Sequence, residues 1–127
     1  MKYFCPSLLY LMIYIIEDDK SVISAFELFL ESADMEFKSY CSAENFLSFF
    51  QPDANDMLIL DLNLPGMNGC DLLKKFEHAG LKTPVIVVTA HDDPSSHESC
   101  RQYGVKAYLR KPVDGEALIK IIQKHLV

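Results

Sequence analysis

The sequence lacks the features that mark disulfide-rich and Cys/His metal-binding proteins. Its four cysteines never occur as C-x-x-C, and its four histidines show no spacing typical of metal ligands. A globular domain of this size needs no disulfide bonds to fold. We therefore interpret the cysteines as reduced thiols and expect the protein to be cytoplasmic.

Long apolar segments and basic clusters are missing as well. The apolar stretch from Leu8 to Ile16 is too short to span a bilayer, and it runs directly into three acidic residues. A single lysine near the start, with no small-residue cleavage site after it, argues against a signal peptide. The net charge is −6, and no patch rich in lysine and arginine occurs. The sequence therefore predicts that the chain has no membrane-spanning segment and does not itself bind nucleic acid directly.

What is present is the composition of one globular domain. The chain has 127 residues, of which half are apolar and about a quarter are charged. This length is enough to bury a single core. We expect residues 1–11 to be a leader that is disordered or extends the first strand, and residues 12–127 to form the domain.

Apolar runs alternate with helical patterns five times along the chain. The runs predict strands at 11–16, 35–40, 57–61, 85–89 and 107–110. The helical patterns are 21–33, one capped by Ser42, 70–78, a short one ending at Gly104, and one capped by Asp114. Either Asp18 or Asp19 is placed to cap the first helix. This alternation predicts an α/β fold, a flavodoxin-like (βα)5 domain with a doubly wound, parallel five-stranded sheet in strand order 2-1-3-4-5.

Polar side chains end or directly follow four of the five predicted strands. Because the carboxyl ends of parallel strands share one edge of a sheet, these side chains should lie together at the switch point, where ligands bind in such folds. Any one of them could be an ordinary cap or turn residue, but their joint placement indicates a site. The residues are Glu17 to Asp19, Asp61, Thr89 and Lys111.

The residue types at this edge favour phosphoryl chemistry. Crowded carboxylates repel one another unless a cation compensates, and a site made only of oxygen ligands suits Mg²⁺. Lys111 supplies a further positive charge and Thr89 a hydroxyl, which together could neutralise the oxygens of a phosphoryl group. Asp61 would then be the nucleophile, forming an acyl phosphate.

Four motifs carry a resemblance to a known family. The segments 15–19, 58–69, 85–90 and 108–112 resemble, in this order, the receiver domains of two-component response regulators. The likeness covers nearly all of residues 12–127. It implies that Asp61 is the phosphoacceptor, which takes its phosphoryl group from a sensor histidine kinase or a phosphotransfer protein. It also implies a domain that phosphorylates and dephosphorylates itself and is otherwise no enzyme.

The same resemblance implies a ligand set for the metal. Asp18 and Asp61 would bind Mg²⁺ directly, Glu17 would bind it through water, and the backbone carbonyl of Asn63 would be the third protein ligand. Mn²⁺ can take the place of Mg²⁺ in such a site. The acidic pair is Glu-Asp where Asp-Asp is the commoner pattern of the family, a small departure.

Further residues are assigned by the resemblance to switching. Lys111 would pair with the phosphoryl group and precede a cis peptide at Pro112, and Thr89 and Tyr108 would form the switch pair. The face made by the fourth helix, fifth strand and fifth helix would then control an output domain or partner, or form a homodimer.

Two side chains are predicted to tune the lifetime of the phosphorylated state. Asn63 and His91 lie two positions beyond Asp61 and Thr89. At strand ends this spacing should lean both side chains over the mouth of the pocket, where water must enter. His91 could shield the phosphoryl group or accept a proton from the water.

Two other functions use similar residues. One is a Mg²⁺-dependent aspartyl-nucleophile phosphatase or phosphotransferase of the haloacid dehalogenase type. Against it, Asn63 stands where that class has a second acid, and the acidic pair precedes the nucleophile. The other is a degenerate receiver that only docks partners, although every residue that phosphorylation needs is present.

Overall fold

The computed structural model describes residues 11–49, 56–90 and 102–126, and within them it has one five-stranded sheet. All neighbouring strands are parallel and their order is β2-β1-β3-β4-β5, which confirms the predicted topology. The strands are β1 (Ile13–Ile16), β2 (Phe37–Tyr40), β3 (Met57–Asp61), β4 (Val85–Thr89) and β5 (Ala107–Arg110). The helices are α2 (Lys20–Ser32), α3 (Ala43–Phe49), α4 (Gly69–His78) and α6 (Gly115–Leu126).

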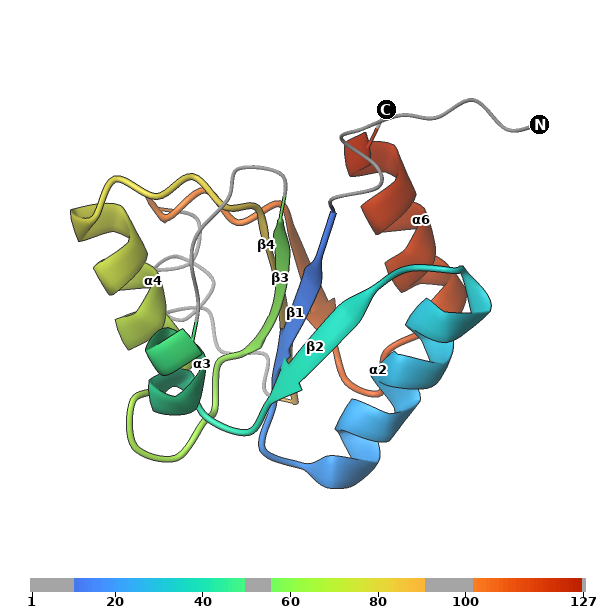
Figure 1. The fold of residues 1–127 in the computed structure, drawn as a ribbon, viewed down its shortest axis with the longest axis horizontal. Helices are drawn as coiled ribbons and strands as arrows, with labels where there is room; N and C mark the ends of the chain where they lie inside the picture. The colour runs from blue at the N-terminus through green and yellow to red at the C-terminus, as the bar shows by residue number, and fades with distance from the viewer. Residues whose placement is uncertain (1–10, 50–55, 91–101, 127) are drawn as a thin grey trace.

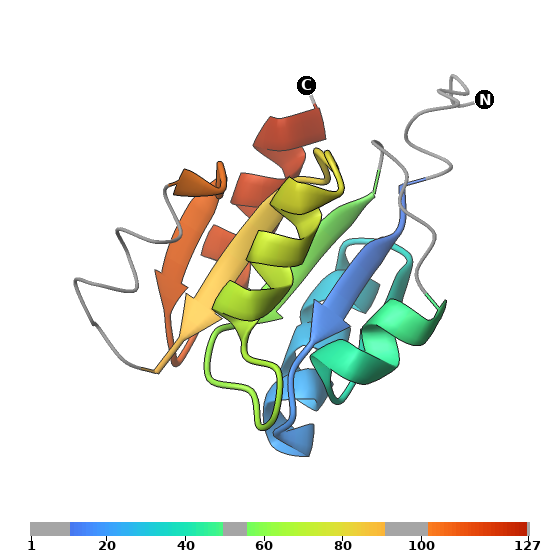
Figure 2. The same ribbon diagram turned by 90° about the vertical axis from the view of Figure 1, so that its left-hand side faces the viewer.

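The helices cover both faces of the sheet, α3 and α4 on one and α2 and α6 on the other (Figures 1 and 2). Side chains of the central strands alternate between two cores, because successive residues of a strand point to opposite faces. Leu58 and Leu60 of β3 pack with α3 and α4, whereas Met57 and Ile59 pack with α2 and α6. The most buried helical residues of the second core are Phe26, Leu30, Leu118 and Ile122.

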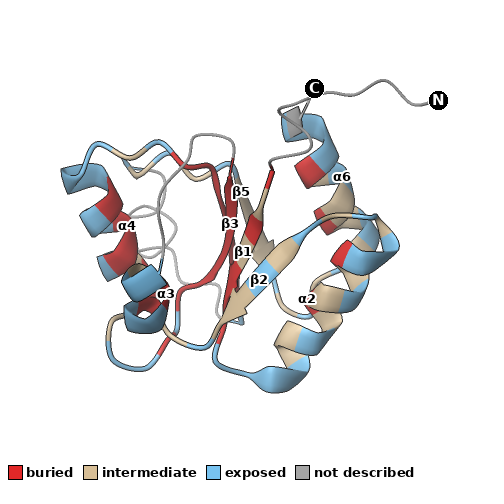
Figure 3. Cartoon of the chain, viewed as in Figure 1, coloured by how far each residue is buried: buried red, intermediate tan, exposed pale blue. Residues whose placement is uncertain are grey.

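Burial divides the strands as a doubly wound sheet requires. Every residue of β3 and β4 is buried, while β2 and β5 at the sheet edges are half-exposed (Figure 3). The two fully buried strands, β3 and β4, have the bounds that their continuous apolar runs predict. Among the described residues, no helix has the length and apolar character needed to cross a bilayer.

The second strand begins two residues later than predicted. After α2 the backbone N–H of Met35 turns back and donates to the carbonyl of Leu30 at 3.0 Å. Asp34 takes the left-handed conformation, with φ of 56°, that commonly ends a helix. Met35 therefore belongs to the end of α2, and β2 starts at Phe37 instead.

The first strand is also shorter than predicted. The backbone N–H of Met12 faces the side chain of Asp56, at 3.4 Å from Oδ1, so regular pairing with β2 starts only at Ile13. Each described helix begins within one residue of its predicted start. Most of the predicted short helix that ends at Gly104 lies outside the described residues, as does the proposed leader up to residue 10.

Candidate functional site

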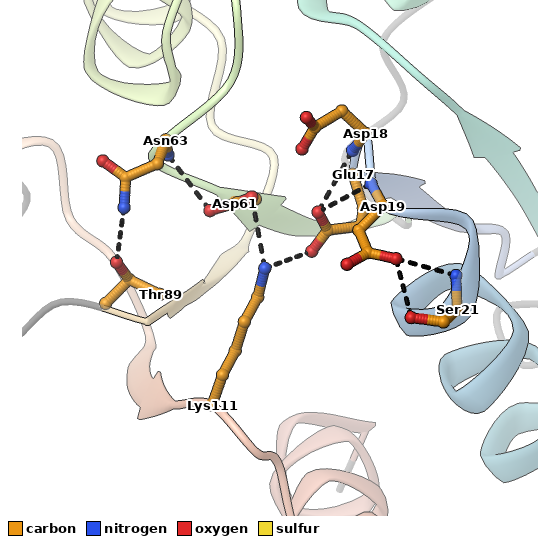
Figure 4. A network of polar contacts seen from close by, with 8 residues as sticks. All are labelled: Glu17, Asp18, Asp19, Ser21, Asp61, Asn63, Thr89 and Lys111. Carbon is orange, nitrogen blue, oxygen red and sulfur yellow. Dashed lines mark hydrogen bonds and ion pairs between the residues drawn. The ribbon is translucent and has the colours of Figure 1, made fainter.

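The carboxyl ends of β1, β3, β4 and β5 bring the predicted polar residues to one edge of the sheet (Figure 4). Asp61 is the last residue of β3 and is buried. Its Oδ1 accepts a hydrogen bond from the backbone N–H of Asn63 at 3.0 Å, and its Oδ2 lies 3.2 Å from Nζ of Lys111. Asp61 is thus a fixed carboxylate with a cation directly beside it.

The short segment after β1 arranges three acids in different ways. Glu17 is buried, and its Oε2 accepts hydrogen bonds from the backbone N–H groups of Asp18 at 3.1 Å and Asp19 at 3.2 Å. Asp19 caps α2, because its Oδ1 accepts from the N–H of Ser21 at 2.9 Å and from its hydroxyl at 2.7 Å. The choice between the two predicted caps therefore falls on Asp19. Asp18 is exposed and remains available to a ligand.

Lys111 connects two of the acids. Its Nζ lies 2.5 Å from Oε1 of Glu17 as well as 3.2 Å from Oδ2 of Asp61. Burial raises the pKa of Glu17 to about 7, and the negative charge of Asp61 adds to this, while the hydrogen bond with Lys111 opposes it. Burial alone would lower the pKa of Lys111, but the two carboxylates outweigh it and hold that pKa above its usual value.

The acids of this edge fit a hard cation. One carboxylate oxygen from each of Glu17, Asp18 and Asp61 can be chosen so that all three lie within 4.8 Å of one another. The only positive side chain in contact with two of them is Lys111, so three acids share one cation at this edge in the described part of the chain. Oxygen donors with surplus negative charge are what Mg²⁺ requires.

The end of β4 is linked to the loop after β3. Thr89 is buried, and its Oγ1 accepts a hydrogen bond from Nδ2 of Asn63 at 3.1 Å. The backbone N–H of Lys111 donates to the carbonyl of Thr89 at 2.8 Å, which holds the end of β5 beside that of β4. The peptide bond between Lys111 and Pro112 is cis. Sequence reasoning placed Asn63 at the mouth of the site but did not indicate its side-chain contact with Thr89.

Tyr108 lies on β5, beside Val87 of β4, and packs against the core on the α3 and α4 side of the sheet. Its side chain is half-buried. His91, the other residue predicted to lie near Thr89, falls outside the described residues.

The fold and this edge together are those of a known family. Residues 13–123 match the family model of the response regulator receiver domain. The chain belongs to the response regulator receiver domain family. Receiver domains are signalling domains of two-component systems, so a phosphatase of the haloacid dehalogenase type is not favoured.

Relatives of this receiver domain agree with that assignment. It is 30% identical to the transcriptional regulatory protein FixJ of Azorhizobium caulinodans over 116 residues, 91% of this chain and 55% of that protein. It is 31% identical to the DNA-binding transcriptional regulator NtrC of Klebsiella pneumoniae over 111 residues, 87% of this chain and 24% of that protein. The chain thus spans about half of FixJ and a quarter of NtrC.

Solved structures show the same fold. The crystal structure of FixJ-N aligns with a TM-score of 0.80 at 28% identity, over 91% of this chain and 95% of that one. The response regulator StyR aligns with a TM-score of 0.83 at 28% identity, over 90% of this chain and 58% of that one.

Proposed function

We propose that this receiver domain takes a phosphoryl group from a sensor histidine kinase, or from a phosphotransfer protein, onto Asp61. The observation that carries the proposal is a buried carboxylate at the switch point with Lys111 Nζ 3.2 Å away. The acidic pair Glu17 and Asp18 lies beside it. A cytoplasmic location and a domain that spans residues 12–127 are parts of the same proposal.

The metal would be held by residues of two loops. Asp18, Asp61 and the backbone carbonyl of Asn63 would bind Mg²⁺ directly, with Glu17 acting through water and Mn²⁺ as a substitute. When bound, the ion supplies positive charge for the phosphoryl oxygens. Lys111 lies where it can pair with the same oxygens, since its Nζ is already directed at Asp61.

The transfer itself is a nucleophilic displacement. A carboxylate oxygen of Asp61 forms a bond to phosphorus while the bond from phosphorus to the donor nitrogen breaks, and that nitrogen takes up a proton. The product is an acyl phosphate. Its later hydrolysis by water would be the only other reaction of the domain.

Intact-mass spectrometry after incubation with Mg²⁺ and phosphoramidate tests the phosphoacceptor. We expect one phosphoryl addition to the wild type and none to Asp61→Asn. Asp19→Asn is the matched control, because asparagine caps a helix as well as aspartate does. An addition to Asp61→Asn at the wild-type rate would overturn the assignment.

Phosphorylation would be read out through Thr89 and Tyr108. Thr89 would exchange its hydrogen bond from Asn63 for one to the phosphoryl group, and Tyr108 would turn into the space that Thr89 leaves. Such a change shifts the population of a surface that has two states. That surface would be made by the predicted helix ending at Gly104, β5 and α6, and would control an output domain, a partner or a homodimer.

Chemical-shift mapping with beryllium fluoride, a mimic of the phosphoryl group, tests this readout. We expect changes to extend along β5 and α6 in the wild type and to disappear in Asp61→Asn. Changes confined to the residues around Asp61 would contradict a switch. Light scattering with and without the mimic would show a dimer or exclude one.

A further inference from the structure

The loop between β3 and α4 is held by a residue of a distant helix. Glu44 lies in the first turn of α3, and its Oε2 accepts a hydrogen bond from the backbone N–H of Met67 at 3.1 Å. The hydrogen bond from Met67 is the main cause that lowers the pKa of Glu44, so the group is ionised at neutral pH. The contact joins residues 23 positions apart.

The fit between Glu44 and the loop is close. At Gly66 a side chain would place its Cβ 2.6 Å from Oε2 of Glu44, and the φ of 71° at this position also favours glycine. The carboxylate of Glu44 thus occupies the space that a side chain at position 66 would need. Because Glu44 is exposed and its carboxylate could move aside, the positive φ of Gly66 is the stronger requirement for glycine here.

The helix that carries Glu44 is firmly placed. Phe46, two residues on, is fully buried. Its ring makes edge-on contacts with those of Tyr14, at 5.5 Å between centroids, and Tyr40, at 5.3 Å. Glu44 therefore holds the loop to β1 and β2 through a packed aromatic cluster.

The loop that Glu44 holds carries a proposed metal ligand. Its ends are joined by a hydrogen bond from the N–H of Gly69 to the carbonyl of Leu62 at 3.1 Å. Leu62 and Leu64 are buried and fix the first part of the loop, while Gly66 is exposed. The contact between Glu44 and Met67 restrains the second part.

We propose that Glu44 is a positioning residue of the metal site, which restrains the second part of the β3–α4 loop through Met67 and so limits movement of the loop whose first part carries the carbonyl of Asn63. The inference rests on the proposed function, in which that carbonyl is a Mg²⁺ ligand. In this proposal Glu44 is no ligand itself and acts through Met67. It would raise metal affinity because a loop that is already ordered loses less conformational entropy when the metal binds.

Two conservative variants separate the hydrogen bond from the charge. Glu44→Asp keeps the charge and the preference for a first helical turn, but its shorter side chain loses its reach to Met67. Glu44→Gln loses the charge but keeps an oxygen at the same reach. Glu116→Gln, which removes the exposed first-turn acid of α6, is the matched control.

Calorimetric titration with Mg²⁺, without phosphodonor, is the measurement. We expect Glu44→Asp to weaken binding by about threefold, because an exposed hydrogen bond such as the one from Met67 contributes at the low end of the usual range. Glu44→Gln and Glu116→Gln should bind within about twofold of the wild type. In phosphorylation by phosphoramidate, Glu44→Asp should raise the half-saturating Mg²⁺ concentration more than it lowers the rate at saturation.

The possible results distinguish a failure of this inference from a failure of the proposed function. A wild type that binds no Mg²⁺ refutes the metal site and the inference together. A wild type that binds Mg²⁺, with Glu44→Asp unchanged, refutes the inference alone. Weaker binding by Glu44→Gln than by Glu44→Asp would assign the effect to charge and would also refute it.

Discussion

The two acidic loops of the site are built in opposite ways. The loop after β1 is held mainly by its own residues, since Glu17 accepts from the next two backbone N–H groups and Asp19 caps the helix that follows. From outside, only the start of this loop is contacted in the described part of the chain, where Lys111 and the carbonyl of Tyr40 meet Glu17. The loop after β3 is held partly from outside, by Glu44 of α3 and by Thr89 of β4.

Because of this difference, the two loops should play different parts in the site. A loop fixed mainly by local bonds presents its acids at a nearly constant position when other elements move. A loop tied to other elements moves when those elements move, so it can pass a change at Asp61 to its surroundings. Variants that affect only one of the two loops should therefore have different consequences.

The largest effect should come from Gly69→Ala, which disturbs the β3–α4 loop. A Cβ at this position would lie 2.8 Å from the carbonyl oxygen of Asp61 and 2.8 Å from Cα of Leu62. Because both atoms belong to the backbone, the loop must shift and carry Asp61 with it. We expect the unfolding free energy to fall by about 1–3 kcal/mol, and phosphorylation by phosphoramidate to slow more than about tenfold.

Gly80→Ala is the control for this variant. Unlike Gly69, Gly80 has a positive φ, of 71°, and nothing lies within 4 Å of a Cβ built there. It should therefore cost about 1 kcal/mol in urea denaturation and leave phosphorylation unchanged. Equal phosphorylation rates in the two variants would contradict the close approach at Gly69.

Features that depend on local patterns were the easier ones to predict. The bounds of β3 and β4 follow from apolar runs, and the strand order follows from the alternation of strands and helices, because both depend on burial patterns that the sequence displays. The acids at the end of β1 were recognised as a cap and a pair of site residues. Only the choice between Asp18 and Asp19 as the cap had to come from the structure.

Contacts between distant residues could not be predicted in this way. Nothing in the pattern around Glu44 indicates that it bonds to Met67, and Asn63 gave no sign of its contact with Thr89. The late start of β2 had the same cause, because Met35 bonds back to Leu30 instead of pairing with a strand. Each of these depends on how elements approach one another, which periodicity does not encode.

Asp18→Asn should have the next largest effect and acts on the local loop. Asp18 is exposed, and one of its carboxylate oxygens lies within 4.8 Å of oxygens of Glu17 and Asp61, so it could bind the proposed ion together with them. We expect Mg²⁺ affinity to fall at least about tenfold in calorimetric titration. The neighbouring variant Asp19→Asn should bind as the wild type does. If Asp18→Asn also binds as the wild type does, Asp18 is no direct ligand.

The raised pKa of Glu17 predicts a pH dependence of stability in metal-free protein. The pKa of Glu17 is about 7 in the folded protein, whereas its ordinary value is 4.5. Between these two pH values Glu17 is therefore protonated in the folded protein but has lost its proton in the unfolded chain. This contribution to stability is complete below pH 4.5 and is lost as pH rises through about 7.

Urea denaturation in the presence of a chelator at pH 5 and pH 8 measures this loss. We expect the unfolding free energy of the wild type to fall between these pH values by on the order of 1–2 kcal/mol more than that of Glu17→Gln. Parallel pH profiles for the two proteins would show that the local loop holds Glu17 in its charged form at no cost.

The smallest effect should be on the lifetime of phosphorylated Asp61, and it tests the externally held loop. Asn63→Ala removes the amide that donates to Thr89 at 3.1 Å, but it keeps the backbone carbonyl and the N–H that bonds to Asp61. The side chain of Asn63 is exposed, and we predict that it leans over the mouth through which water must reach phosphorus. We expect the dephosphorylation rate to change by about threefold when intact mass is followed over time. His91→Ala should change it several-fold, in a direction that tells shielding from base catalysis. If both lifetimes equal that of the wild type, neither side chain controls how water reaches the phosphoryl group.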